Sequence, residues 1–318
     1  MLRASPTRVL SRALACALCL LASASGGSAL ADEPRSVVVV KSRDDGPYES
    51  VVSGVRGALR GRKDVTLRVG SLEQGGGEAA LESVRIARRA ATSPLITVGS
   101  KATAAALETP GKGAVIACMI VGAHELGRDQ NATGVVLEFP IEVQLGWIRN
   151  VLPHGQAIGV LYNPAQNEER VTQATRAASR LGLRIVAREV HRPQDLPAAL
   201  ESLAQEADLL LALTDQIVLS PRTAEAILLF SFRNRIPFSG LSASWVKAGA
   251  LYALERDYED LGAQCGEMAI RVLDGTAPSS MPPAVPRKVA YALNVRTAEH
   301  LKLDLPATLV AGAAQVFR

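Results

Sequence analysis

The sequence predicts an α/β fold in which parallel strands alternate with amphipathic helices. The strand candidates are continuous apolar runs, such as residues 37–40 and 209–211, which is typical of strands covered by helices on both faces. The segments between them carry apolar residues at helical spacing. About nine β/α units are more than one sheet of this kind usually holds, so we expect two doubly wound parallel-sheet lobes joined by a hinge.

Each expected strand is a short run rich in β-branched and other apolar residues. In chain order the strands are residues 36–41, 65–69, 95–98, 114–118, 134–137, 157–162, 184–190, 209–213 and 251–254. The helices expected between them are residues 48–60, 77–91, 102–107, 140–152, 166–181, 197–206, 221–235 and 258–273. The helix at 166–181 shows the pattern most clearly, because Gly182 follows it as a stop signal.

The first crossing between lobes is expected at residues 150–156. Residues 32–153 then form the first lobe and residues 154–318 the second. Residues 94–106 and 208–224 each run from an apolar strand through small or polar residues into a helix. If the lobes are similar halves, these two turns face each other across a cleft.

Residues 1–31 have the features of a secretory signal peptide. Arg3, Arg8 and Arg12 precede an apolar run, and Ala29-Leu30-Ala31 offers a small-residue cleavage site. The run is shorter than the roughly 20 residues that span a bilayer, which disfavours the alternative of an uncleaved anchor. We therefore expect an exported mature protein that is soluble outside the cytoplasm.

Charge and motifs exclude several function classes. The formal net charge is +4, but three of the 35 basic residues lie in the leader, so no basic stripe for nucleic acid remains. A G-x-S-x-G turn, a P-loop and a G-x-G-x-x-G motif are all absent, and the four histidines lack metal-ligand spacing. We expect no enzyme, no cofactor and no metal.

Two cysteines, Cys118 and Cys265, remain after the leader. Export would permit a disulfide between them. Two buried thiols are the favoured interpretation, because free cysteine is among the most buried residue types.

Polar and aromatic residues follow several of the expected strands, where open parallel sheets bind ligands. The candidate ligand-binding residues are Tyr48, Gly99, Ser100, Glu138, Asn163, Thr214, Asp215, Gln216, Ser242 and Trp245.

These residue types suit a small polar solute. Ser100 and Thr214 could hold a carboxylate through hydroxyl and backbone N–H groups, although both also suit helix N-caps. Glu138 or Asp215 could pair with an ammonium, and Asp215→Ala is expected to abolish binding while leaving the apo melting temperature nearly unchanged. Tyr48 and Trp245 could cover an apolar part of the ligand, whereas Trp147 is expected in the core.

Several segments resemble ABC-transporter substrate-binding proteins of the group that includes tryptophan- and tyrosine-binding members. They are residues 131–152, 158–164 (IGVLYNP), 213–215 (LTD), 235–239 (RIPFS), 247–251 (KAGAL), 258–262 (YEDLG) and 294–303. The resemblance implies a type I-like periplasmic-binding-protein fold in which residues of about 256–280 return to the first lobe. It also implies that the turns at Gly99-Ser100 and Thr214-Asp215 lie at the ligand.

The resemblance further implies delivery of the ligand to an ABC permease with its ATPase. We expect a monomeric periplasmic protein whose ligand is an amino acid or related carboxylate, because hydroxyls at helix starts suit an acidic group. The alternative is a periplasmic sensing module that presents its closed form to a membrane receptor. Neither interpretation involves nucleic acid.

Overall fold

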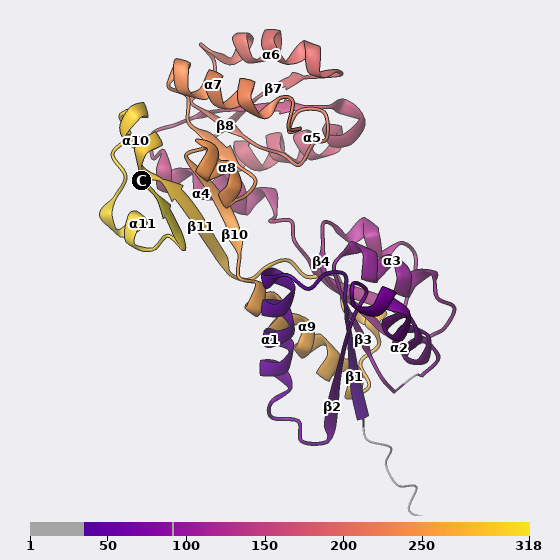
Figure 1. The fold of residues 1–318 in the computed structure, drawn as a ribbon. Helices are drawn as coiled ribbons and strands as arrows, with labels where there is room; N and C mark the ends of the chain where they lie inside the picture. The colour runs from indigo at the N-terminus through magenta and orange to yellow at the C-terminus, as the bar shows by residue number, and fades with distance from the viewer. Residues whose placement is uncertain (1–34, 91) are drawn as a thin grey trace, which may run out of the picture.

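The computed structural model describes residues 35–90 and 92–318, which form two lobes, each built around one sheet with helices on both faces (Figure 1). The predicted signal peptide, residues 1–31, lies outside the described residues. The α/β architecture and its division into two sheets confirm the predicted fold class. None of the described helices combines the length and the hydropathy that crossing a membrane would require.

The first lobe holds a parallel sheet of order β2-β1-β3-β4-β5. Its strands are β1 (Arg35–Lys41), β2 (Val65–Ser71), β3 (Leu95–Val98), β4 (Val115–Ile120) and β5 (Ala132–Val136). Its helices are α1 (Gly46–Leu59), α2 (Glu78–Arg89), α3 (Ser100–Glu108) and α9 (Tyr258–Leu273), with short 3₁₀ turns at Gln74–Gly77, Ala123–Leu126 and Pro278–Ser280.

Alternation along β1 explains how this sheet is covered. Val37 and Val39 pack with α1 and α9 on one face, and Val38 and Val40 pack with α2 and α3 on the other. Because successive side chains of a strand point to opposite faces, a run of four valines requires helices on both sides.

The second lobe holds a sheet of order β12-β11-β10-β9-β8-β6-β7, in which only the β10–β11 pair is antiparallel. Its strands are β6 (Ala157–Tyr162), β7 (Arg184–Glu189), β8 (Leu209–Leu211), β9 (Phe238–Gly240), β10 (Tyr252–Arg256), β11 (Val289–Asn294) and β12 (Gln315–Phe317). Its helices are α4 (Ile141–Val151), α5 (Pro164–Arg180), α6 (Leu196–Leu203), α7 (Ala224–Asn234), α8 (Ala243–Ala248), α10 (Val295–Leu301) and α11 (Ala307–Ala311), with a 3₁₀ turn at Pro193–Asp195.

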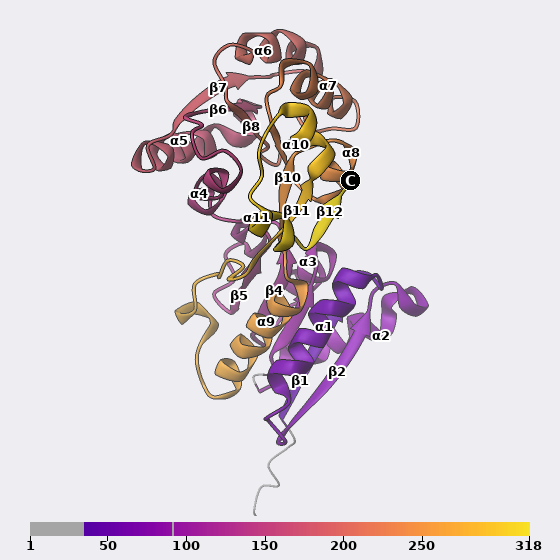
Figure 2. The ribbon, with the colours of Figure 1, turned by 90° about the vertical axis from the view of Figure 1, so that its left-hand side faces the viewer.

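The chain passes between the lobes three times (Figure 2). The first crossing, residues 137–140, joins β5 to α4. The second joins β10 to α9 at Arg256 and Asp257, and the third leads into β11 at Lys288. Because β5 and β10 run directly into crossings, the carboxyl ends of the parallel strands in both sheets lie at the junction of the lobes.

The first crossing lies earlier than the sequence predicts. The sequence places it at residues 150–156, with residues 32–153 in the first lobe. In the structure, Ile141, Leu145 and Ile148 of α4 pack into the second lobe's core with β6 and α5. The expected boundary is therefore wrong by one helix, because an apolar helix face does not say which sheet it covers.

Helix α9 returns to the first lobe and lies against α1, although more than 190 residues separate them along the chain (Figure 1). Glycines allow the two helices to approach closely. A Cβ atom on Gly54 of α1 would lie 1.8 Å from the carbonyl oxygen of Glu259, and one on Gly262 would lie 2.0 Å from that of Val51. The α1–α9 contact thus joins backbone directly to backbone.

Cys118 on β4 and Cys265 on α9 are both free and fully buried in the core shared by the sheet, α1 and α9. The Cys118 thiol donates a weak hydrogen bond to the carbonyl of Leu261, one helical turn before Cys265 (3.7 Å). Burial raises the pKa of the Cys265 thiol, and the neighbouring Cys118 sulfur raises it further. The two residues therefore lie close together, both shielded from solvent, and the Cys265 thiol is held in its less reactive protonated form.

A thiol reagent at neutral pH is expected to leave the native mature protein, without residues 1–31, unlabelled and to label Cys118 and Cys265 after unfolding. The physical reason is burial, which denies the reagent access to both sulfurs and also raises the pKa of Cys265. Mass spectrometry before and after denaturation checks this. Rapid labelling of the native protein would contradict the burial, and failure to label the unfolded chain without reductant would reveal a disulfide instead.

Candidate functional site

A cavity of about 40 Å³ lies at the carboxyl edge of the second lobe's sheet, beside the first and second crossings. Residues from the ends of β8, β9 and β10, from the first crossing and from α4 and α5 surround it. Its polar side chains are Glu138, Gln144, Arg170, Thr214, Ser239, Tyr252 and Arg256. Of the residues predicted from the sequence, Glu138 and Thr214 line this cavity.

Glu138 already has a partner inside the protein. Its carboxylate forms an ion pair with Arg170 of α5. In this structure the charge of Glu138 is therefore compensated by a neighbouring helix, and its pairing with a ligand ammonium stays a prediction.

Arg256, at the end of β10, has no such partner. Its Nε donates a hydrogen bond to the carbonyl of Leu137 in the first crossing (2.7 Å), and its guanidinium lies 4.9 Å from the centre of the Phe139 ring. No carboxylate of the described residues lies within 4.0 Å of its nitrogens. Burial lowers the pKa of Arg256, an effect that Tyr258, Glu255 and Glu138 only partly oppose.

Tyr252 contributes a second polar group without a partner in the described part of the chain, its hydroxyl. Its ring stacks on Trp147 at 5.1 Å, and Trp147 also packs against Tyr291, so Trp147 belongs to the core. The Tyr252 hydroxyl is buried without a well-formed hydrogen bond to any described residue, although Ser239 lies near it. Burial raises its pKa, so the hydroxyl stays neutral and can donate a proton in a hydrogen bond.

Asp215 is a structural residue in this geometry, contrary to its predicted role as a partner for an ammonium. Its side chain is 3% exposed. One carboxylate oxygen accepts hydrogen bonds from the Asn163 backbone (2.7 Å) and the Asn167 side chain (2.9 Å). The other accepts from the backbones of Ile217 and Val218 (both 2.9 Å). The first two bonds fasten the loop after β8 to the start of α5, and the other two close the turn of that loop.

The remaining predicted residues of the second lobe either form contacts within the fold or lie at its surface. The Asn163 side chain donates to the carbonyl of Val190 (2.9 Å) and so serves the scaffold. Gln216 is exposed, and its backbone N–H donates to the Gln166 side chain. Trp245 is partly buried and packs edge-on against Phe238 at 5.7 Å, and its role as a cover for the ligand stays a prediction. Ser242 precedes α8 at its N-cap position.

The first lobe offers a second cluster at its own carboxyl edge. Gly99 has φ of 93°, and a Cβ there would lie 2.8 Å from both the Ser42 hydroxyl and the Tyr48 ring. The Ser42 hydroxyl, missed by the sequence analysis, accepts a hydrogen bond from the backbone of Ala102 (2.9 Å) and so caps α3. Ser100, expected as a possible cap, is instead exposed. Tyr48, Gly99 and Ser100 are thus gathered on one edge.

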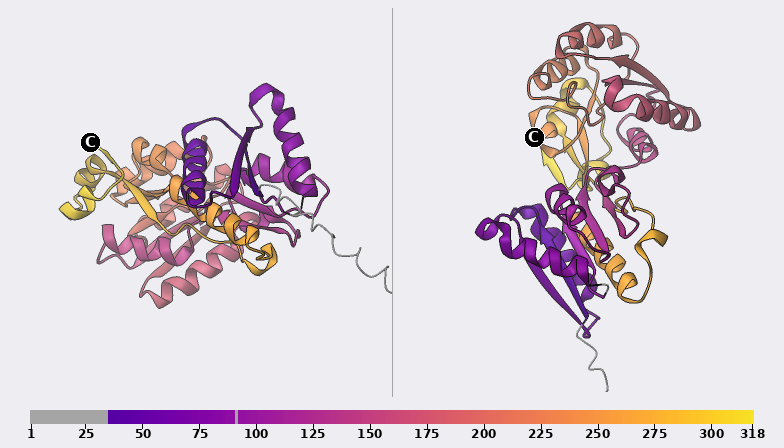
Figure 3. Two further views of the ribbon diagram at one scale, coloured as in Figure 1. Left: turned by 90° about the horizontal axis from the view of Figure 1, so that it is seen from below. Right: turned by 90° about the vertical axis from the view of Figure 1, so that its right-hand side faces the viewer.

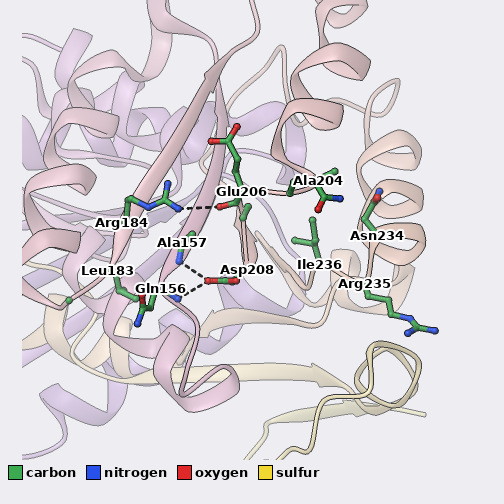
Figure 4. Close-up of a pocket in the computed structure, with 13 residues that line it drawn as sticks. Gln156, Ala157, Leu183, Arg184, Ala204, Glu206, Asp208, Asn234, Arg235 and Ile236 are labelled. Carbon is green, nitrogen blue, oxygen red and sulfur yellow. Dashed lines mark hydrogen bonds between the residues drawn. The ribbon is translucent and has the colours of Figure 1, made fainter.

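A larger hollow of about 760 Å³ lies at the opposite, amino end of the second lobe's strands (Figure 4). Several of its polar groups form hydrogen bonds with one another. Asp208 accepts from the backbone N–H groups of Gln156 and Ala157, and Arg184 donates to the carbonyl of Glu206. Ligands of open parallel sheets bind at the other edge, so the candidate site is the cavity beside the crossings.

Within the described ranges, no group of three or more His, Cys, Asp and Glu side chains is arranged to hold a metal ion. The groups that converge at the candidate site are the Glu138–Arg170 ion pair, several neutral polar side chains and one arginine without a carboxylate partner among the described residues. Such an arrangement can hold an anionic or polar solute.

Comparison with known proteins gives a consistent result. Residues 78–317 match the family described as ABC transporter substrate binding protein. A tyrosine-binding protein of Clostridioides difficile is 25% identical over 176 residues, which span 55% of this chain and half the length of that relative.

Solved structures share the fold. A ligand-free, open substrate-binding protein from Clostridium difficile has a TM-score of 0.69 at 19% identity, covering 89% of this chain and 99% of that one. A protein from Streptococcus pneumonia in complex with L-Trp has a TM-score of 0.56 at 19% identity, with the same coverage. Because the family match extends over most of the sequence, the chain belongs to the ABC transporter substrate-binding proteins, which are binding proteins and not enzymes.

Proposed function

We propose that this protein captures a small carboxylate-bearing solute, an amino acid or a close relative, between its two lobes. The observation that carries the proposal is the cavity beside the crossings. Its lining includes two arginines and one glutamate, which leaves one positive charge without a partner in the described residues. The relatives described as binding tyrosine and as a complex with L-Trp support the same class of ligand.

Capture requires the lobes to close on the solute. The second lobe supplies the cavity, and the first lobe supplies the edge formed by Tyr48, Gly99 and Ser100. Figure 3 shows the lobes joined end to end, an arrangement that suits a hinge. The ligand favours the closed state only through the extra contacts that it makes there.

The proposal includes an exported protein that hands its solute to an ABC permease outside the cytoplasm. The leader-like sequence of residues 1–31 supports export. The family match supports delivery to a permease rather than presentation to a membrane receptor.

A thermal-shift screen tests the binding function. Amino acids, small organic acids and nucleosides are each added to the purified mature protein. We expect a carboxylate to raise the apparent stability by mass action, by about 2.7 kcal/mol at a ligand concentration 100 times the dissociation constant. Small-angle scattering with the same compound should show a smaller radius of gyration. Stabilisation without compaction would contradict closure, and no stabilisation by any compound would contradict the proposed function.

A further inference from the structure

We propose that Arg256 receives the carboxylate of the ligand, with the Tyr252 hydroxyl as an additional donor. This inference rests on the proposed function and assigns the group that selects a carboxylate. Neither residue is among those predicted from the sequence.

The charge balance of the cavity points to Arg256 and away from Arg170. Arg170 is neutralised by Glu138. Arg256 is half-buried, lies over the Phe139 ring, and meets no carboxylate of the described residues within 4.0 Å. A desolvated charge without a partner is costly, whereas a carboxylate placed against it would offset that cost.

The geometry of the guanidinium suits a carboxylate. Its Nε is engaged by the Leu137 carbonyl, and its two terminal nitrogens have no acceptor within residues 35–90 and 92–318. A guanidinium presents its donors as a planar fork that matches the two oxygens of a carboxylate. The buried Tyr252 hydroxyl, which also lines the cavity, can donate to the same group.

The size of the cavity limits what enters. Its volume of about 40 Å³ exceeds the roughly 10–15 Å³ that one water requires, but is far below the 300–1,000 Å³ of sites that enclose whole ligands. A carboxylate head group fits such a space, while the rest of the ligand stays between the lobes. The cavity therefore serves as a subsite for the head group.

Arg256 also lies where the crossings meet. It belongs to the second crossing and bonds the first through the Leu137 carbonyl. The adjacent Asp257 forms an ion pair with Lys288 of the third crossing (3.4 Å). A ligand held by Arg256 thus contacts the segments that must bend on closure, so occupancy and closure are coupled.

The test compares ligands with and without the carboxylate. Calorimetry measures L-tyrosine, L-tryptophan and the carboxylates of the screen, each against its amide, on wild type, Arg256→Gln and Arg256→Lys. We expect wild type to prefer a carboxylate by at least tenfold and Arg256→Gln to lose that preference. Arg256→Lys keeps the positive charge without the planar pair of guanidinium donors and should retain only part of the preference for the carboxylate. The control Arg180→Gln removes an exposed arginine of α5, paired with Glu142, and should change neither affinity.

The ratio of acid to amide affinity, and not the apo melting temperature, separates ligand recognition from a structural role. Arg256→Gln loses the bond to the Leu137 carbonyl together with a costly desolvated charge, so we expect the melting temperature to change little. Whatever that change, the ratio of acid to amide affinity decides, because a purely structural Arg256 would weaken acid and amide equally. Equal weakening of acid and amide overturns the inference. An Arg256→Gln variant that keeps the preference for the carboxylate also overturns it. In both cases the proposed binding function stands. A wild type that binds only uncharged nucleosides overturns the assignment of a carboxylate, and one that binds nothing overturns the proposed function with it.

Discussion

Replacing Gly262 by alanine is expected to lower the free energy of unfolding by about 3 kcal/mol or more, at the upper end of the range for overpacking. The added Cβ would lie 2.0 Å from the carbonyl oxygen of Val51 on α1. Because the obstacle is backbone, no side-chain rotation can relieve the clash, and α9 must move away from α1. Gly54→Ala, whose Cβ would meet the Glu259 carbonyl oxygen at 1.8 Å, should behave alike. Chemical denaturation measures both.

Gly57→Ala is the matched control. Gly57 lies on the same helix as Gly54 and is exposed, and no atom outside its own helix lies within 4 Å of the place that an added Cβ would take. Alanine there should stabilise the helix by about 1 kcal/mol at most, because it is the better helix former. If Gly54→Ala and Gly57→Ala had the same effect, the close approach of α1 and α9 would be disproved.

Replacing Asp215 by alanine is expected to lower the free energy of unfolding by about 3 kcal/mol, because several donors lose their acceptor and each buried donor left unpaired costs about 1–3 kcal/mol. Four N–H donors, including those of Asn163 and Asn167, would lose their acceptor in a buried site. The loop that carries Thr214 would also lose its anchor, so ligand affinity should fall as a consequence. Denaturation of the apo protein, followed by titration of ligand, separates the two effects.

The neighbouring substitution Gln216→Ala serves as the control. Gln216 is exposed, and its side chain should matter little, within about 0.5 kcal/mol. The expected loss of stability in Asp215→Ala reverses the prediction made from the sequence, where this substitution removes binding without destabilising the apo protein. If the apo stability were unchanged and binding were lost, the pairing of Asp215 with the ligand would be restored.

The sequence was sufficient for the fold class because long apolar runs such as Val37 to Val40 can be buried only in a sheet covered on both faces. It was insufficient for β9, β11 and β12. Strand β9 has only three residues and ends in Gly240, and β11 shows a buried run only over its last three residues. Such short or half-covered strands depend on their neighbours for pairing, which periodicity does not reveal.

The candidate site was predicted only in part, because the sequence shows which residues follow a strand but not which partners they meet in the fold. The rule that ligands gather at strand ends led to Glu138 and Thr214. It could not show that Glu138 is compensated by Arg170, or that Asp215 accepts four hydrogen bonds. Arg256 offered one signal, a charged residue closing an apolar strand, but its lack of a partner depends on tertiary contacts.

The return of α9 to the first lobe has a consequence for biosynthesis. A growing polypeptide emerges with its amino-terminal part first. Val51 and Val55 of α1 nevertheless cannot complete their packing until Leu261 and Cys265 are made, and these are translated only after most of the second lobe. The first helix of this lobe to be translated is therefore among the last to complete its packing, and its uncovered valines are exposed to chaperones in the interval.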